Sequence, residues 1–143
     1  MTAIATWKNK VHAAENGGNY PRWVEAILDI GVTGTVAQND TVQLLNCIGT
    51  VVVHRVVWEI LTAFTATVDL TVGKATGTEL STAINVDGAA GTQGVGTNTV
   101  DVLFTNDTVD VAVLNAAAAA GKIRFWFLVS DLAVPMLTSQ QVP

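Results

Sequence analysis

Hydrophobic and polar residues alternate along most of the chain after residue 21, which is the pattern of β-strands with one buried face. The clearest example is ATVDLTVG (66–73), in which Val68, Leu70 and Val72 alternate with threonine and aspartate. Val and Thr are stiff at χ1 and fit a pleated, half-buried surface. The alternating segments predict strands over 22–30, 41–48, 51–63, 66–73, 97–104, 108–115 and 121–132.

Turn-forming residues separate these segments, and no segment has the length and period of an ordinary helix. AAAAAG at 116–121 is far shorter than the dozen or so residues that an isolated helix needs, so it predicts a connection. The segment 51–63 exceeds a typical strand and predicts a bend or bulge. Together the segments predict an all-β fold: an antiparallel β-sandwich of the jelly-roll type with about seven or eight strands.

The tetrapeptide NDTV occurs twice, at 39–42 and 106–109, and each copy continues into a β-like run that ends in Leu-Asn. Asn and Asp favour turns because their side chains bond to the local backbone. After each copy come a strand, a corner of small residues and an apolar strand with one Trp and one Arg. The echo predicts two similar strand-turn-strand units, as in paired Greek keys.

The chain divides into three predicted parts. Residues 1–20 lack a clear period and end in ENGGNY before Pro21, so we interpret them as an N-terminal arm, with a short helix over 7–14 as the alternative. A sandwich domain (21–135) and a C-terminal tail (136–143) follow. The Gly-rich stretch 86–98 predicts a long flexible connection or, alternatively, a partner-contact loop.

The composition is apolar for a chain of 143 residues. Half of the residues are hydrophobic and 13% are charged, against roughly 25% in an average soluble domain. No run of about 18 apolar residues is present, so no membrane partner is predicted. Either other subunits cover apolar surface, which we favour, or the loops are short and neutral. The net charge of −5 and the scattered basic residues argue against a nucleic-acid partner.

The sequence contains no recognisable catalytic or metal-binding pattern, and no cofactor is predicted. One cysteine, Cys47, and two histidines, His12 and His54, lack the spacing of a zinc site. Cys47 lies in an apolar run and His54 alternates with valines, which predicts a buried thiol and a packed or interface histidine. A sandwich hydrolase with a carboxylate pair is an alternative that nothing in the sequence selects. Three aspartates alternate with valines and are predicted to be solvated: Asp69, Asp101 and Asp110.

Aromatic residues outside the core pattern are the candidate partner-interface residues. Trp23 shares a predicted strand face with Glu25, and Trp126 shares one with Arg124. Interfaces are enriched in such aromatics, although Trp126 could equally cover its own sandwich. The candidate interface residues are Trp7, Tyr20, Trp23 and Trp126.

Two stretches, GTVVVHRVVWEILTAFTATVDLTVGKATGTE (49–79) and NDTVDVAVLNAAAAAGKIRFWFLVSDL (106–132), resemble small structural proteins of tailed bacteriophages, and AAGKIR is the most specific part. The resemblance is to head decoration, or cement, proteins. It implies a non-enzymatic homotrimer that is made in the host cytoplasm, binds the major capsid protein on the capsid surface of the virion and stabilises contacts between capsomers. A tail or head-tail module that binds carbohydrate or a receptor is the alternative.

Overall fold

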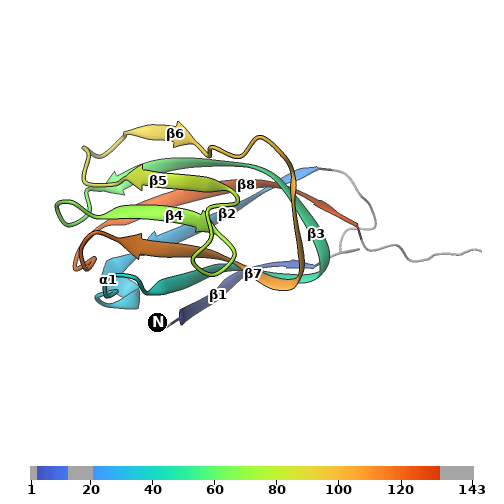
Figure 1. Ribbon diagram of the computed structural model, residues 1–143, viewed down its shortest axis with the longest axis horizontal. Coiled ribbons are helices and arrows are strands. Elements are labelled where there is room, and N and C mark those ends of the chain that lie inside the picture. Colours follow the sequence, from blue (N-terminus) through green and yellow to red (C-terminus); the bar gives the residue numbers. More distant parts are fainter. Residues whose placement is uncertain (1–2, 13–20, 133–143) are drawn as a thin grey trace, which may run out of the picture.

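The computed structural model describes the backbone of residues 3–12 and the whole of residues 21–132 (Figure 1). The regular structure in this part of the chain is strand, apart from one helix, α1 (Ile30–Thr33), of four residues. The all-β prediction is therefore confirmed. The strands are β1 (Ala3–His12), β2 (Arg22–Asp29), β3 (Thr41–Thr62), β4 (Asp69–Gly73), β5 (Ser81–Asn85), β6 (Gln93–Val95), β7 (Val102–Leu114) and β8 (Lys122–Asp131).

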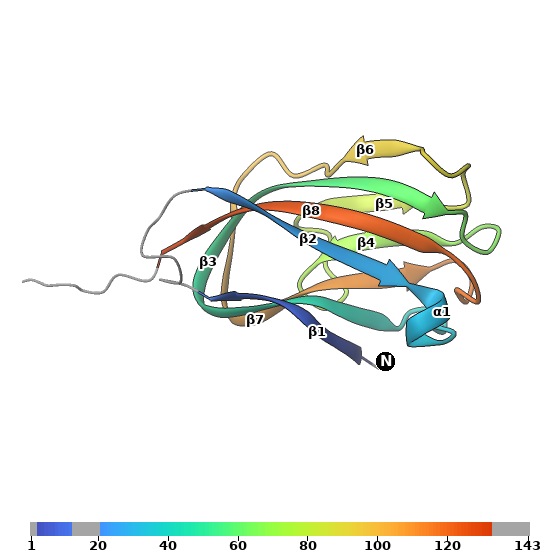
Figure 2. The same cartoon turned by 180° about the vertical axis from the view of Figure 1, so that it is seen from behind.

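Strand β3 belongs to both layers of a sandwich. Its C-terminal half pairs with β8 and β6, and β8 pairs in turn with β2; we call this layer the β8 sheet. Its N-terminal half pairs with β1 and β7, and the order continues to β4 and β5; we call this layer the β7 sheet. Figures 1 and 2 show the two layers from opposite sides. Apart from the parallel β1–β3 pair, the pairing is antiparallel, which confirms a jelly-roll-like sandwich.

The long strands β3 and β7 change layer at the same place. Gly49 in β3 (φ 78°) and Asn106 in β7 (φ 47°) both have left-handed backbone conformations, and the β3–β7 register shifts between Cys47 and Thr50. Glycine adopts positive φ without strain, and asparagine tolerates it better than most residues. The bend does not interrupt pairing. The prediction of separate strands at 41–48 and 51–63, and at 97–104 and 108–115, was therefore wrong: each pair is one bent strand.

The two runs that begin with NDTV are antiparallel neighbours, so each NDTV copy lies opposite the end of the other run. Thr41 pairs with Ala112 and Asn46 pairs with Thr108, and the N–H of Asn39 donates to the carbonyl of Val113 at 2.7 Å. The first copy forms a turn before β3, as predicted. The second lies inside β7, where Asn106 bends the strand without ending it. The echo therefore marks two antiparallel neighbours within one sheet.

The core follows the predicted alternation closely in β2 and β8. Ala26 and Leu28 of β2 are buried, while Trp23, Glu25 and Ile27, on the other face of the strand, are exposed. The inward residues of β8 are fully buried: Ile123, Phe125, Phe127 and Val129. The β7 sheet faces them with Leu70, Val72, Val109, Val111 and Phe104. These side chains form one core between the sheets.

Four elements are absent from the prediction: β1, β5, β6 and α1. Strand β6 lies in the Gly-rich stretch that we expected to be a flexible connection, and its Gly94 leaves space for the indole of Trp58 across the strand pair. Helix α1 is capped by Asp29, whose Oδ1 accepts the N–H of Gly31 at 2.9 Å. Val100, expected on a buried strand face, is 70% exposed in the connection before β7.

The predicted N-terminal arm is only partly described. Residues 3–12 form β1, so the helix alternative does not hold there. Residues 13–20 and the predicted tail (136–143) lie outside the described residues, and the division into arm, sandwich and tail stays a prediction.

Candidate functional site

The outward surface of the β8 sheet gathers apolar side chains from four strands. Trp126 of β8 lies opposite Glu25 of β2 and Val57 of β3, and Val57 lies opposite Val95 of β6. Because side chains alternate along each strand, and the alternate residues of β2 and β8 are buried in the core, this set points outward. We call it the aromatic face. Its apolar members are Trp23, Ile27, Val57, Val95, Trp126 and Leu128.

Several of these side chains are open to solvent. Trp23, on the edge strand β2, is 53% exposed, and Val95, on β6 at the opposite edge of the same face, is 56% exposed. Ile27 is 38% exposed. Trp23 pairs with Leu128, two residues from Trp126, so the two tryptophans are diagonal neighbours on adjacent strands. Exposed apolar residues that lie together on one face mark interaction surfaces more often than scattered ones do.

Arg124 on the aromatic face is ion-paired with two glutamates, whereas Arg55, opposite Leu128 on the same face, is exposed and makes no ion pair with a described residue. Arg124 Nε lies 3.0 Å from Glu25 Oε2, and Arg124 Nη1 lies 3.9 Å from Glu59 Oε1. The guanidinium also lies 5.4 Å from the centroid of the Trp126 ring, a cation–π geometry. Such half-exposed ion pairs contribute little to stability. The face therefore presents apolar side chains around the ion-paired Arg124.

Two of the four predicted interface residues, Trp23 and Trp126, therefore lie on one face. The side chain of Trp7 and the whole of Tyr20 lie outside the described residues. Ile27 was missed although the sequence carries its signal, because it alternates with Trp23 and Glu25 on the polar side of β2. Val95 had no such signal, since β6 is only three residues long.

His54 is packed between two side chains, as predicted. Its Nε2 lies 2.7 Å from Ser130 Oγ and its Nδ1 lies 3.0 Å from Asp101 Oδ2. This Ser–His–Asp order also occurs in serine hydrolases. A nucleophilic serine, however, must be reachable by a carbonyl carbon, as on the sharp turn of a hydrolase elbow. Ser130 is 6% exposed within β8, beside the fully buried Val129 and Asp131, so the group fits a structural role.

The segment before β7 is held by the same histidine. Asn98 Nδ2 donates to the carbonyl of His54 at 3.0 Å, and Asp101 lies in the same connection. His54 sits where the β3–β8 register shifts, between Val53 and Arg55. The histidine therefore ties a bulge in β3 to β8 and to the connection that leads into β7.

Cys47 is fully buried, as predicted. Burial, with smaller contributions from the charges of Asp107 and Asp131, raises the pKa of its thiol to about 12. The thiol is therefore protonated at neutral pH and is not a nucleophile. Within residues 3–12 and 21–132, no three His, Cys, Asp or Glu residues are grouped closely enough to hold a metal ion.

Asp110 departs from the prediction of a solvated carboxylate, since it is only 6% exposed. The connection after β4 covers it, because Gly73 pairs with Asp110 and the N–H of Ala75 bonds to its carboxylate. Thr108 Oγ1 donates to Asp110 Oδ1 at 2.6 Å. Burial is the largest cause that raises the pKa of Asp110. Asp101 is exposed, as expected.

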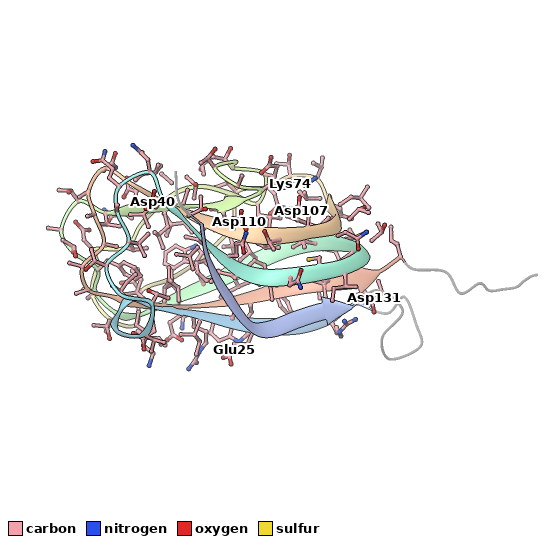
Figure 3. The ribbon with its side chains drawn as sticks, turned by 90° about the horizontal axis from the view of Figure 1, so that it is seen from below. Glu25, Asp40, Lys74, Asp107, Asp110 and Asp131 are labelled. Atoms are coloured by element: carbon pink, nitrogen blue, oxygen red, sulfur yellow. The ribbon has the colours of Figure 1, made fainter. Side chains whose placement is uncertain are left out.

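Charge is distributed unequally over the described residues. The β8 sheet (β2, the second half of β3 and β8) contains four basic and four acidic side chains and is neutral in sum. The remainder of 21–132 contains one lysine and seven acidic side chains, a balance of −6. Figure 3 shows Asp40, Asp107 and Asp110 on the side away from Glu25. The acidic set is Asp40, Asp69, Glu79, Asp87, Asp101, Asp107 and Asp110.

No described helix is both long and apolar enough to cross a membrane. No family model matches the sequence, and no curated protein matches it. Solved structures do share its fold, among them chains from three phage capsids.

Three of these structures cover most of the chain. A chain in the capsid of Ralstonia phage GP4 has a TM-score of 0.63 at 16% identity, over 87% of this chain and 99% of that one. A chain in the cyanophage Pam1 capsid asymmetric unit has a TM-score of 0.59 at 24% identity, over 79% and 86%. A chain in the acid-stable capsid of Helicobacter pylori bacteriophage KHP30 has a TM-score of 0.55 at 15% identity, over 79% and 89%. At these identities the likeness shows a common fold.

Proposed function

We propose that this protein is a non-enzymatic structural protein of a phage virion that binds the outer surface of the capsid and stabilises contacts between capsomers. The observation that carries the proposal is the fold shared with chains from three phage capsids. Function inferred from a fold is an analogy, so the proposal needs support from this chain's own surface and an experiment of its own.

The matches extend over most of both chains. This chain spans 99%, 86% and 89% of the matched chains, so the similarity covers the whole sandwich. The proposal places this sandwich on the capsid shell, with the major capsid protein as its partner.

The chemistry of the described residues supports a structural role. Ser130 is buried, the Cys47 thiol is protonated, and no metal-binding group occurs in the described part of the chain. The prominent surface feature is instead the aromatic face, which fits a protein that works through contacts. We propose a homotrimer, with Trp7, Tyr20, Trp23 and Trp126 as interface residues and with the arm (1–20) contributing to attachment.

Immunogold electron microscopy of virions released from cells that make this protein tests the proposal. Antibodies against the purified protein are expected to label the head surface uniformly and to leave the tail unlabelled. Label confined to the tail would support the alternative tail or head-tail module. Virions without any label, although the protein is abundant in infected cells, would overturn the virion role altogether.

One observation favours the alternative of a carbohydrate- or receptor-binding module: Trp23 is 53% exposed and could stack on a sugar ring. The second tryptophan is less suited, because Arg124 already lies over the ring of Trp126. A glycan array tests the alternative. Binding that is lost in Trp23→Ala would support it, and an array without any signal would dismiss it.

A further inference from the structure

We propose that the aromatic face is the surface through which copies of this chain bind one another. The inference deepens the proposed function, on whose homotrimer it rests, by naming the surface of contact between copies. It does not depend on a capsid as the partner, because it concerns the purified protein alone. It rests on two independent observations, the apolar surface of the β8 sheet and the unequal distribution of charge between the two sides of the sandwich.

The first observation is that this face carries apolar side chains that are exposed among the described residues of a single copy. Trp23 and Ile27 come from β2 and Val95 comes from β6, and each is exposed by more than a third. The inner sides of the same strands already fill the core, so within the described sandwich these residues stay exposed unless a second molecule covers them. Exposed tryptophan and aliphatic side chains beside the central Trp126 match the composition of protein–protein contacts.

The second observation decides what that molecule is. Each copy carries a net charge of −5, so two copies repel unless they meet where little charge lies. The β8 sheet is neutral in sum, whereas the remainder of 21–132 carries −6. Contact through the aromatic face turns the acidic sides of both copies away from each other. A strongly basic partner would instead be attracted to the acidic side.

The contacts of Arg124 also support a second copy of this chain as the molecule that covers the face. Its guanidinium is ion-paired with Glu25 and Glu59 of its own chain and lies over Trp126. The face therefore offers one covered ring to a sugar. A second copy of the same face meets it without net repulsion, because the charges of the β8 sheet sum to zero.

The size of the face sets the expected strength. Three strands about 4.8 Å apart and about eight residues long at ~3.3 Å each, with the three-residue β6 beside them, give a planar area of about 430 Å². Interfaces of standard size bury about 800 Å² on each partner. The contact is smaller than this standard size, so the association should be weak and depend on protein concentration.

Sedimentation velocity of the purified protein from about 1 μM to 1 mM tests the inference. The wild type is expected to shift from one chain of 15.0 kDa to multiples of that mass as concentration rises. Trp23→Lys should remain at one chain throughout. Ile27→Lys is a second variant on the same face, in case the first disturbs the edge strand. Val100→Lys is the matched control, because it adds the same charge at a 70% exposed residue in the connection before β7.

Salt provides a second readout. Contact through a neutral apolar face should strengthen when NaCl is raised from 50 to 500 mM, since screening removes the repulsion between copies of −5. Association that weakens with salt, an unshifted wild type at 1 mM, or association unchanged in both Trp23→Lys and Ile27→Lys would each overturn the inference. Each of these results would leave the capsid-binding proposal to its own test on virions.

Discussion

The backbone N–H of Gly49 donates a 2.9 Å hydrogen bond to Oδ1 of Asn106, which lies 57 positions later in the chain. Both residues have positive φ, and they face each other where β3 and β7 bend from one layer to the other. Two residues that a sequence pattern assigns to turns thus form a corner inside continuous strands. At this corner β3 and β7 stay paired on both sides of the bend and so connect the two layers. Its loss should therefore lower the free energy of unfolding of the whole sandwich.

The corner provides the first prediction. Gly49→Ala is expected to lower the free energy of unfolding by about 1–2 kcal/mol, because a Cβ at positive φ is strained. Asn106→Ala is expected to cost a similar amount, since it loses the hydrogen bond and keeps the unfavourable φ. Asn106→Gly, which relieves the backbone, should cost less than Asn106→Ala. Urea denaturation of the three variants is the measurement, and an Asn106→Gly variant less stable than Asn106→Ala would contradict this account.

Burial of Asp110 predicts a pH dependence. Its folded-state pKa is raised above the ordinary value of 3.8, so in the pH range just above 3.8 the folded state binds more protons than the unfolded state. The contribution of Asp110 to stability therefore falls as pH rises through this window, and at neutral pH the buried carboxylate is a cost. Asp110→Asn, which still accepts a hydrogen bond at Oδ1, should be more stable than the wild type at pH 7.

The comparison is made by urea denaturation at pH 4 and pH 7. The advantage of Asp110→Asn should shrink at pH 4, where the wild-type carboxyl is closer to neutral. Asp87→Asn is the control, because that exposed carboxylate makes its own contact, with the N–H of Thr67 at 3.1 Å. An advantage of equal size at both pH values would show that burial of the charge is not its cause.

How far the sequence predicts the fold depends on whether the signal is local. The alternation in β8 is strong and is produced by residues of that strand alone, so its buried face was predicted correctly. Whether Gly49 and Asn106 end a strand depends on the strand opposite, which local pattern does not contain. Strand β6 exists through its pairing with Val57, Trp58 and Glu59, far away in the sequence.

The same distinction applies to the candidate site. Alternation places Trp23 and Trp126 on polar faces of their strands, and the β2–β8 pairing makes them neighbours. The solvated state predicted for Asp110 failed because a connection from β4, not its own strand, covers it. Features that depend on segments far apart in the sequence, including the burial of Asp110 and the position of Val95 on the aromatic face, are visible only in the structure.

His54 provides a prediction that separates a structural role from a catalytic one. His54→Ala leaves the buried Ser130 hydroxyl without this partner, and we expect a loss of about 1–3 kcal/mol in the free energy of unfolding. Asp101→Asn removes only an exposed partner and should cost at most about 1 kcal/mol. Hydrogen exchange should also quicken in residues 96–101 of His54→Ala. Hydrolysis of p-nitrophenyl acetate by the wild type that disappears in a folded Ser130→Ala variant would reverse this interpretation.

The last prediction links the packing of β6 to self-association without altering the aromatic face directly. A Cβ at Gly94 would overlap the indole of Trp58, so Gly94→Ala should push β6 away from β3 and move Val95 out of the face. We expect weaker association in sedimentation velocity, together with a change in tryptophan fluorescence. Gly88→Ala is the control in the same connection, because its Cβ would meet Thr92 Oγ1 at an ordinary 3.6 Å. If Gly94→Ala changed the fluorescence but left association at the wild-type level, β6 would lie outside the contact, and the face between copies would be confined to β2, β8 and β3.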